Sequence, residues 1–318
     1  MKKKKLKWLV IFLAPLFFIA ACGKASETDD FANENKKTQI VSSIFPVYEI
    51  VREIAGEQAE VHLMVGSGED AHHYEPSAKA ITLVNEADAF IYSGDEMEFW
   101  ASDMLSVVES DDLAVFQLGK GLDLELEEDH AEEDHDEEDH GHDHGDIDPH
   151  YWLNPLAIHK QIPELIDLLS AIDPTGEEIY QANGEKLMQT LEKLDKDYQS
   201  SFAGASNRSF IVQHKAFGHL ANRYNLEQLS VGGLSTEVEP NPKDLIKIIE
   251  FVNENQTEVI FYQSGNTSAV AETIARETAA EISILYDLEN KPEGLDAADN
   301  YYIEAMYHNL KELKKVIN

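Results

Sequence analysis

Three histidines stand in short motifs next to predicted strands and helices, and their imidazole nitrogens could bind a metal ion. His72 lies in GSGEDAHHYEP, His150 in DPHYWLNP, and His214 at the end of SFIVQH. Zinc prefers imidazole and thiolate ligands, and the chain has a single cysteine, so histidine must supply the site. Three histidines on zinc serve either a metal-binding protein or, with a bound water, a hydratase or hydrolase.

The composition favours cation binding over catalysis or nucleic-acid recognition. The 318-residue chain carries a net charge of −36. Such a charge repels the phosphates of nucleic acids and attracts metal cations. The chain also has no HExxH motif and no identifiable general base beside the three histidines, which argues against a zinc enzyme.

A second group of histidines lies in the segment 125–146, ELEEDHAEEDHDEEDHGHDHGD. It holds thirteen acidic residues and no basic one. A segment of this composition cannot bury enough apolar surface to fold, so we expect a disordered loop. Because histidine recurs with acids in each block, the loop is expected to collect zinc weakly; the alternative is a solvated spacer. Its histidines are His130, His135, His140, His142 and His144.

Apolar runs rich in Val, Ile and Phe alternate with helical patterns along the rest of the chain. The runs occur at 39–44, 59–65, 89–94, 113–118, 209–213, 226–231, 258–263 and 282–286. This alternation predicts an α/β protein with mainly parallel sheets, in two lobes. Ligands of such sheets collect outside the carboxyl ends of the strands, so the three histidines are expected to meet in a cleft between the lobes.

A long helical pattern separates the two halves. It runs from about Gly176 to Ala203, with apolar positions that include Ile179, Leu187 and Leu191. A helix of this length spans roughly 40 Å and is predicted to be a rigid connector, although an ordinary helix of one lobe fits the same pattern. The expected domains are an N-terminal lobe over 38–175, a connecting helix over 176–205 and a C-terminal lobe over 206–318.

The N-terminal residues have the pattern of a secretory signal. Lysines precede an apolar run from Trp8 to Ala21, and IAAC ends at Cys22. The sequence IAAC resembles a bacterial lipobox, which implies removal of residues 1–21 and lipid attachment to Cys22. The polar residues 22–37 would then form a flexible tether. An ordinary signal peptide or an uncleaved anchor is the alternative.

Four motifs in a fixed order carry a family resemblance over about Thr38–Asn318. AHHYEP, DPHYWLNP, FIVQHKAFGHLA and VIFYQSGNTSAVAETIA look like the metal-binding segments of cluster A-I solute-binding proteins. They most resemble the zinc-uptake lipoproteins of the ZnuA/AdcA type. The resemblance implies two (β/α) lobes joined by a long rigid helix. It also implies that His72, His150 and His214 bind the metal. Manganese-binding members tend to carry glutamate at the third position, so His214 favours zinc.

The sequence departs from the family pattern at three positions. Ala71 replaces a common proline, and His73 stands where an acid is common, which makes it a competitor of His72. Gln263 aligns where zinc-binding members often place a glutamate ligand. The fourth ligand is therefore left open between water, the Gln263 carbonyl oxygen and a nearby acid such as Glu239. Asp70, Glu75 and Asp148 are the expected hydrogen-bond partners of the ligating rings.

The resemblance implies a monomeric, lipid-anchored protein on the extracytoplasmic face of a bacterial membrane. It would capture Zn(II) and deliver it to an ABC transporter permease with its ATPase. Both partners would be separate chains, because no P-loop and no multi-span segment occurs here. A manganese or iron carrier of the same fold is the alternative, and a surface adhesin role could coexist with transport. Because zinc needs neutral imidazoles, its affinity is expected to fall as the pH drops through roughly 6.5.

Overall fold

The computed structural model describes most of the chain after residue 36. The described residues are 37–124, 147–230, 245–246, 249–250, 252–253, 257–263, 269–295 and 300–318. Several predicted features lie outside them: the signal segment 1–21, Cys22, the tether up to residue 36, the loop 125–146 with its five histidines, and Glu239. All described elements belong to one compact unit, Lys37–Asn318.

The first lobe is built on a parallel sheet with strand order β2-β1-β3-β4. Its strands are β1 (Thr38–Ser42), β2 (Ala59–Leu63), β3 (Ala89–Tyr92) and β4 (Ala114–Gln117), and its helices are α1 (Phe45–Ala55), α2 (Ala78–Asn85) and α3 (Ala101–Ser106). The central strand β3 is buried at all four positions, whereas the edge strand β4 is mostly half-buried. This is the burial expected when helices cover both faces of a parallel sheet.

The second lobe repeats the same parallel arrangement, with strand order β6-β5-β7-β8. Its described strands are β5 (Ser209–Val212), β6 (Glu227–Ser230), β7 (Val259–Tyr262) and β8 (Glu281–Ile284), and its described helices are α6 (Gly218–Tyr224), α8 (Ala269–Thr278) and α9 (Tyr301–Leu313). Each of the eight predicted apolar runs overlaps one of these strands. The predicted fold class, α/β with two lobes of mainly parallel strands, is confirmed.

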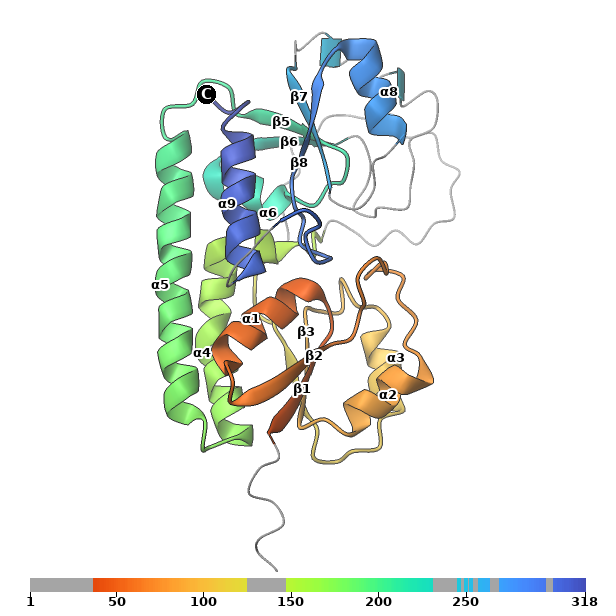
Figure 1. The fold of residues 1–318 in the computed structure, drawn as a ribbon, viewed down its shortest axis with the longest axis vertical. Coiled ribbons are helices and arrows are strands. Elements are labelled where there is room, and N and C mark those ends of the chain that lie inside the picture. The colour runs from red at the N-terminus through yellow and green to blue at the C-terminus, as the bar shows by residue number, and fades with distance from the viewer. Residues whose placement is uncertain are drawn as a thin grey trace, which may run out of the picture. The chain divides into compact units, whose positions relative to one another are not determined.

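Two helices stand between the lobes in the sequence, after the short 3-10 turn η1 (Tyr151–Leu153). They are α4 (Pro155–Ile172) and α5 (Glu177–Phe202), which lie side by side in Figure 1. Asn154 caps α4: its side chain accepts the backbone N–H of Leu156 at 3.0 Å, and Pro155 occupies the first turn. Gly184 lets the helices approach closely, because a Cβ there would lie 2.4 Å from Ile166.

The long helix α5 contacts elements of both lobes, namely α1, α6 and α9. Its buried face runs through Tyr180, Leu187, Leu194 and Phe202. Ile179, which the sequence pattern placed on this face, is 43% exposed instead, and Tyr180 takes the buried position. Among the described helices, none is both long and apolar enough to cross a membrane. The domain boundaries proposed from the sequence stay a prediction.

The last helix, α9, ties the two lobes together. Its first residue, Tyr301, donates its backbone N–H to Glu49 of α1 at 2.8 Å. Toward its other end, Asn309 exchanges two hydrogen bonds of 2.8 Å with the backbone of Tyr286, just after β8. In Figure 1, α9 runs beside α5. A helix expected in the C-terminal lobe therefore also holds the N-terminal one.

Candidate metal centre

Four side chains from distant parts of the chain converge at one point. His72, His150, His214 and Glu289 each offer one ligand atom, and these atoms all lie within 4.8 Å of one another. Three of the four follow the carboxyl ends of strands: His72 follows β2, His214 follows β5 and Glu289 follows β8. The fourth, His150, immediately precedes η1. The sheets thus deliver their ligand-bearing loops to a common site, as parallel α/β sheets do.

The distances within this cluster fit a four-coordinate ion. Oε1 of Glu289 lies 2.9 Å from Nε2 of His150, 3.5 Å from Nε2 of His214 and 3.7 Å from Nε2 of His72. A tetrahedral zinc ion with bonds of about 2.0–2.1 Å separates its ligand atoms by about 3.3 Å. The observed separations bracket this value, so small side-chain shifts suffice to surround an ion.

The cluster is withdrawn from solvent. His150 is fully buried, His214 and Glu289 are each 4% exposed, and the His72 side chain is 9% exposed. Nε2 of His72 is buried and has no hydrogen-bond partner among the described residues. Buried polar atoms in native proteins nearly always have a partner, so this nitrogen, aimed at Glu289, is suited to receive a ligand.

Two aspartates hold the histidine rings from behind. Oδ1 of Asp148 lies 2.6 Å from Nδ1 of His150, and Oδ2 of Asp287 lies 3.2 Å from Nδ1 of His214. A carboxylate on the far ring nitrogen fixes the tautomer that presents Nε2 to a metal. Asp148 was among the partners expected from the sequence, whereas Asp287 was missed.

The other two expected partners behave differently. Asp70 accepts the backbone N–H of His72 at 2.8 Å, while its second oxygen lies 3.5 Å from the ring of His73. Glu75 is exposed. The side chain of His73 is also 57% exposed, so of the two adjacent histidines it is His72 that faces the cluster.

Opposite charges shift the pKa values of the cluster. Burial by itself lowers the pKa of His150, but the charge and hydrogen bond of Asp148, together with Glu289, outweigh it and raise this pKa to about 10. Burial also lowers the pKa of His214, but the charge of Glu289 and the hydrogen bond of Asp287 outweigh this effect. The pKa of His214 is therefore raised above its usual value. Burial raises the pKa of Glu289, yet the charge of His214 and the hydrogen bond of His150 hold it well below its usual value. In the metal-free cluster, the positive charge of protonated imidazole therefore offsets the negative charge of the carboxylates.

The fourth member of the cluster is the residue that sequence reasoning missed. Glu289 follows the strand ISILY much as His214 follows SFIVQ, so its place after β8 was the available signal. The sequence pointed instead to Gln263, which directly follows β7. The side-chain oxygen of Gln263 is buried and lacks a hydrogen-bond partner within the described part of the chain. Its service as a ligand stays a prediction.

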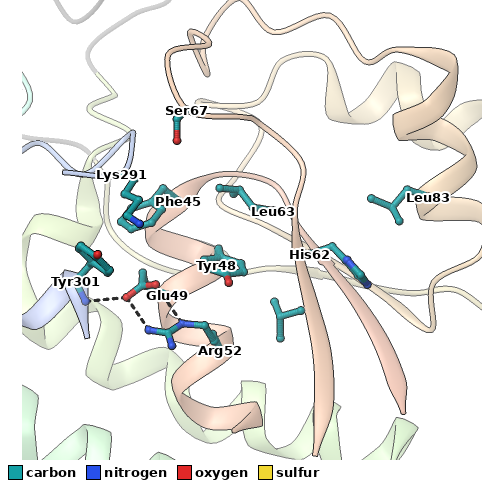
Figure 2. A pocket seen from close by; sticks show the side chains of 11 residues that line it. Phe45, Tyr48, Glu49, Arg52, His62, Leu63, Ser67, Leu83, Lys291 and Tyr301 are labelled. Atoms are coloured by element: carbon teal, nitrogen blue, oxygen red, sulfur yellow. Dashed lines mark hydrogen bonds and ion pairs between the residues drawn. The ribbon is translucent and has the colours of Figure 1, made fainter. Parts of the chain in front are cut away.

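A pocket on the first lobe is separate from the cluster. It lies against α1 and β2 and contains none of the four clustered residues (Figure 2). Its charged groups already have partners: Glu49 bonds Arg52 at 3.1 Å and accepts the N–H of Tyr301, and Lys291 lies 4.5 Å from the centre of the Tyr301 ring. These contacts join α9 and the preceding segment to α1.

Comparison with known proteins finds a match to one protein family over nearly the whole chain after residue 39. Residues 40–316 match the family described as zinc-uptake complex component A, periplasmic. The zinc-binding lipoprotein AdcA of Streptococcus pneumoniae is 34% identical over 319 residues, covering 98% of this chain. The chain spans only 61% of the length of that relative.

Two further similar proteins are covered over nearly their whole length. The high-affinity zinc uptake system protein ZnuA of Bacillus subtilis is 33% identical, covering 98% of this chain and 97% of that protein. The crystal structure of the Zn(II)-bound ZnuA-like domain of Streptococcus pneumoniae AdcA superposes with a TM-score of 0.74 at 31% identity. It covers 89% of this chain and 99% of that domain. The similarity thus extends over both lobes.

Proposed function

Because the chain belongs to the family of periplasmic zinc-uptake complex component A proteins, we propose that it captures Zn(II) outside the cytoplasm and delivers it to a membrane transporter. The proposed ligands are His72, His150, His214 and Glu289. The observation that carries this proposal is the convergence of these four donors within 4.8 Å of one another in a buried position.

The donor set favours zinc over manganese. Three imidazoles and one carboxylate suit zinc, whereas manganese is better served by a site richer in carboxylates and water. The negative charge of Glu289, backed by Asp148 and Asp287, offsets the charge of the cation in a buried place. Zinc is the cargo of this site.

A closed set of four donors also distinguishes binding from catalysis. Catalytic zinc keeps one position open for water or substrate, and Glu289 occupies that position here in our assignment. The matching family is described as a component of an uptake complex and not as an enzyme. The hydratase or hydrolase alternative therefore loses its main support.

The location and partners follow from the same proposal. Lipid attachment at Cys22 would hold the protein at the extracytoplasmic face of a bacterial membrane, and the similar protein AdcA is named a lipoprotein. A permease and an ATPase on separate chains would receive and transport the zinc, and the protein is expected to act as a monomer.

Metal competition tests the proposed function. The metal-free protein is titrated with Zn(II) against a chelator of known affinity, and then with equimolar Zn(II) and Mn(II) followed by elemental analysis after gel filtration. We expect one tightly held zinc and no retained manganese, because the histidine-rich donor set prefers zinc. Retention of manganese in the presence of zinc would overturn the assignment.

Deleting residues 125–146 is expected to leave the tight site intact. The four proposed ligands lie outside this segment, so the shortened protein should bind one zinc with unchanged affinity while losing additional weak binding. Isothermal titration of both proteins measures this. Asparagine at the five histidines of the segment serves as a charge-preserving control. Loss of the tight zinc on deletion would contradict the separation of the two sites.

A further inference from the structure

One local arrangement recurs at three of the four proposed ligands. In each case an aspartate stands two residues before the ligand, and its Oδ1 accepts the backbone N–H of the ligand. The pairs are Asp70 with His72 at 2.8 Å, Asp148 with His150 at 2.9 Å, and Asp287 with Glu289 at 3.2 Å. In the sequence they read DAH, DPH and DLE.

This hydrogen bond closes a tight turn that fixes the backbone leading to the ligand. An aspartate side chain that bonds the main chain two residues on replaces a backbone turn and limits the conformations of the segment. A ligand held in this way loses less conformational freedom when an ion arrives, so the ion binds more tightly. The turn before Glu289 is the most demanding, because Leu288 has a φ of 69°, a region that residues other than glycine rarely adopt.

We infer that Asp70, Asp148 and Asp287 are positioning residues that preorganise the metal cluster before zinc binds. This inference rests on the proposed function and adds to it how the ligands are held in position before zinc binds. None of the three aspartates needs to touch the ion, since each acts through the ligand that follows it.

Two of the three aspartates also link the segment around η1 to the second lobe. The main-chain oxygen of Asp148 accepts from the ring of His219, on α6 of the second lobe, at 2.7 Å. The main-chain oxygen of Asp287 accepts the indole N–H of Trp152, which follows His150, at 2.7 Å. Each of these two turns is therefore also held by a side chain from a distant part of the chain.

These contacts rank the three positions. Asp287 serves two ligands, because Oδ1 holds the backbone of Glu289 and Oδ2 holds the ring of His214. Asp148 serves His150 alone, through both its backbone and its ring. Asp70 holds the backbone of His72. Loss of zinc affinity on substitution should follow the order Asp287, Asp148, Asp70.

The chain offers a matched control at Asp173. Its Oδ1 accepts the backbone N–H of Thr175, two residues on, at 3.1 Å, and its Oδ2 accepts the Tyr180 hydroxyl at 2.7 Å. This aspartate is also nearly buried and stands between α4 and α5. Thr175 is not a proposed ligand, so Asp173 has the same turn without the metal-binding role.

The experiment compares alanine and asparagine at all four aspartates in the full chain. Zinc affinity is measured by chelator competition, zinc release by stopped flow, site geometry by the visible spectrum of the Co(II)-loaded protein, and stability by the melting temperature without metal. We expect Asp287→Ala to weaken zinc binding about 10- to 100-fold, with faster release and an altered cobalt spectrum. Asp70→Asn should restore most of what Asp70→Ala loses, because an amide oxygen still accepts the N–H. Asp287→Asn should restore less, because its amide N–H₂ faces His214.

The control separates positioning from general stability. Asp173→Ala should lower the melting temperature and leave zinc affinity and the cobalt spectrum unchanged. Wild-type affinity and spectrum in Asp287→Ala would overturn the inference, and so would a loss of affinity in Asp173→Ala as large as that in Asp287→Ala. Absence of tight zinc binding in the unaltered chain would instead overturn the proposed function.

Discussion

Replacing Glu289 with glutamine is expected to lower zinc affinity by more than about 100-fold, beyond the loss usual for a residue that only supports a ligand. Glu289 Oε1 lies within 3.7 Å of Nε2 of each clustered histidine, so a single substitution removes the shared anion from all three. The amide keeps the size of the side chain, removes the charge and replaces one oxygen with an N–H₂ donor. Chelator competition at a fixed pH measures the change.

Gln263→Ala is the matched comparison, because Gln263 was the fourth-ligand position indicated by the sequence. We expect this variant to bind zinc with nearly the affinity of the unaltered protein, since three histidines and Glu289 already complete four donors. Strong binding by Glu289→Gln together with weak binding by Gln263→Ala would reverse the assignment of the fourth ligand.

Zinc binding is expected to release at least one proton at pH 7.5. The metal-free His150 has a pKa of about 10, because Asp148 and Glu289 outweigh the effect of burial, so its ring is protonated at this pH. Zinc requires the neutral ring and must displace that proton. Apparent affinity should therefore rise about tenfold per pH unit between pH 6.5 and 8.5. Titration calorimetry in buffers of different ionisation enthalpy counts the protons.

Asp148→Asn separates this effect from ordinary histidine titration. Without the Asp148 carboxylate, the pKa of His150 should fall, and above pH 7.5 the affinity of the variant should depend less steeply on pH than that of the unaltered protein. An unaltered protein that releases no proton at pH 7.5 would show that His150 is already neutral there. The sequence alone placed the loss of affinity near pH 6.5, and the structure moves its onset to higher pH.

The proton on His150 weakens zinc binding but stabilises the metal-free fold. A histidine whose pKa is raised on folding contributes stability that is fully present below its unfolded pKa of about 6.5 and is lost as the pH rises through the folded value. For His150 this window extends to about pH 10. Alkaline pH therefore weakens the empty fold while it strengthens zinc binding.

The sequence by itself predicted the secondary structure and most of the metal-binding motifs. The central strands AFIY at 89–92 and VIFY at 259–262 are continuous apolar runs, because helices cover both faces of the sheet. His72 and His214 follow β2 and β5 in the sequence, and the geometry of parallel sheets brings the carboxyl ends of strands to one edge. These features depend on local sequence, which is why they could be predicted.

Only the tertiary structure decided the partners of those histidines. Glu289 lies 139 residues beyond His150 in the sequence, yet their side chains are 2.9 Å apart. Likewise, Asp287 meets the ring of His214, and Tyr301 of α9 reaches Glu49 on the other lobe. No local pattern encodes such contacts, because they arise where two lobes pack through α5 and α9. An acidic residue in a strongly acidic chain acquires a particular role only from the neighbours that this packing supplies.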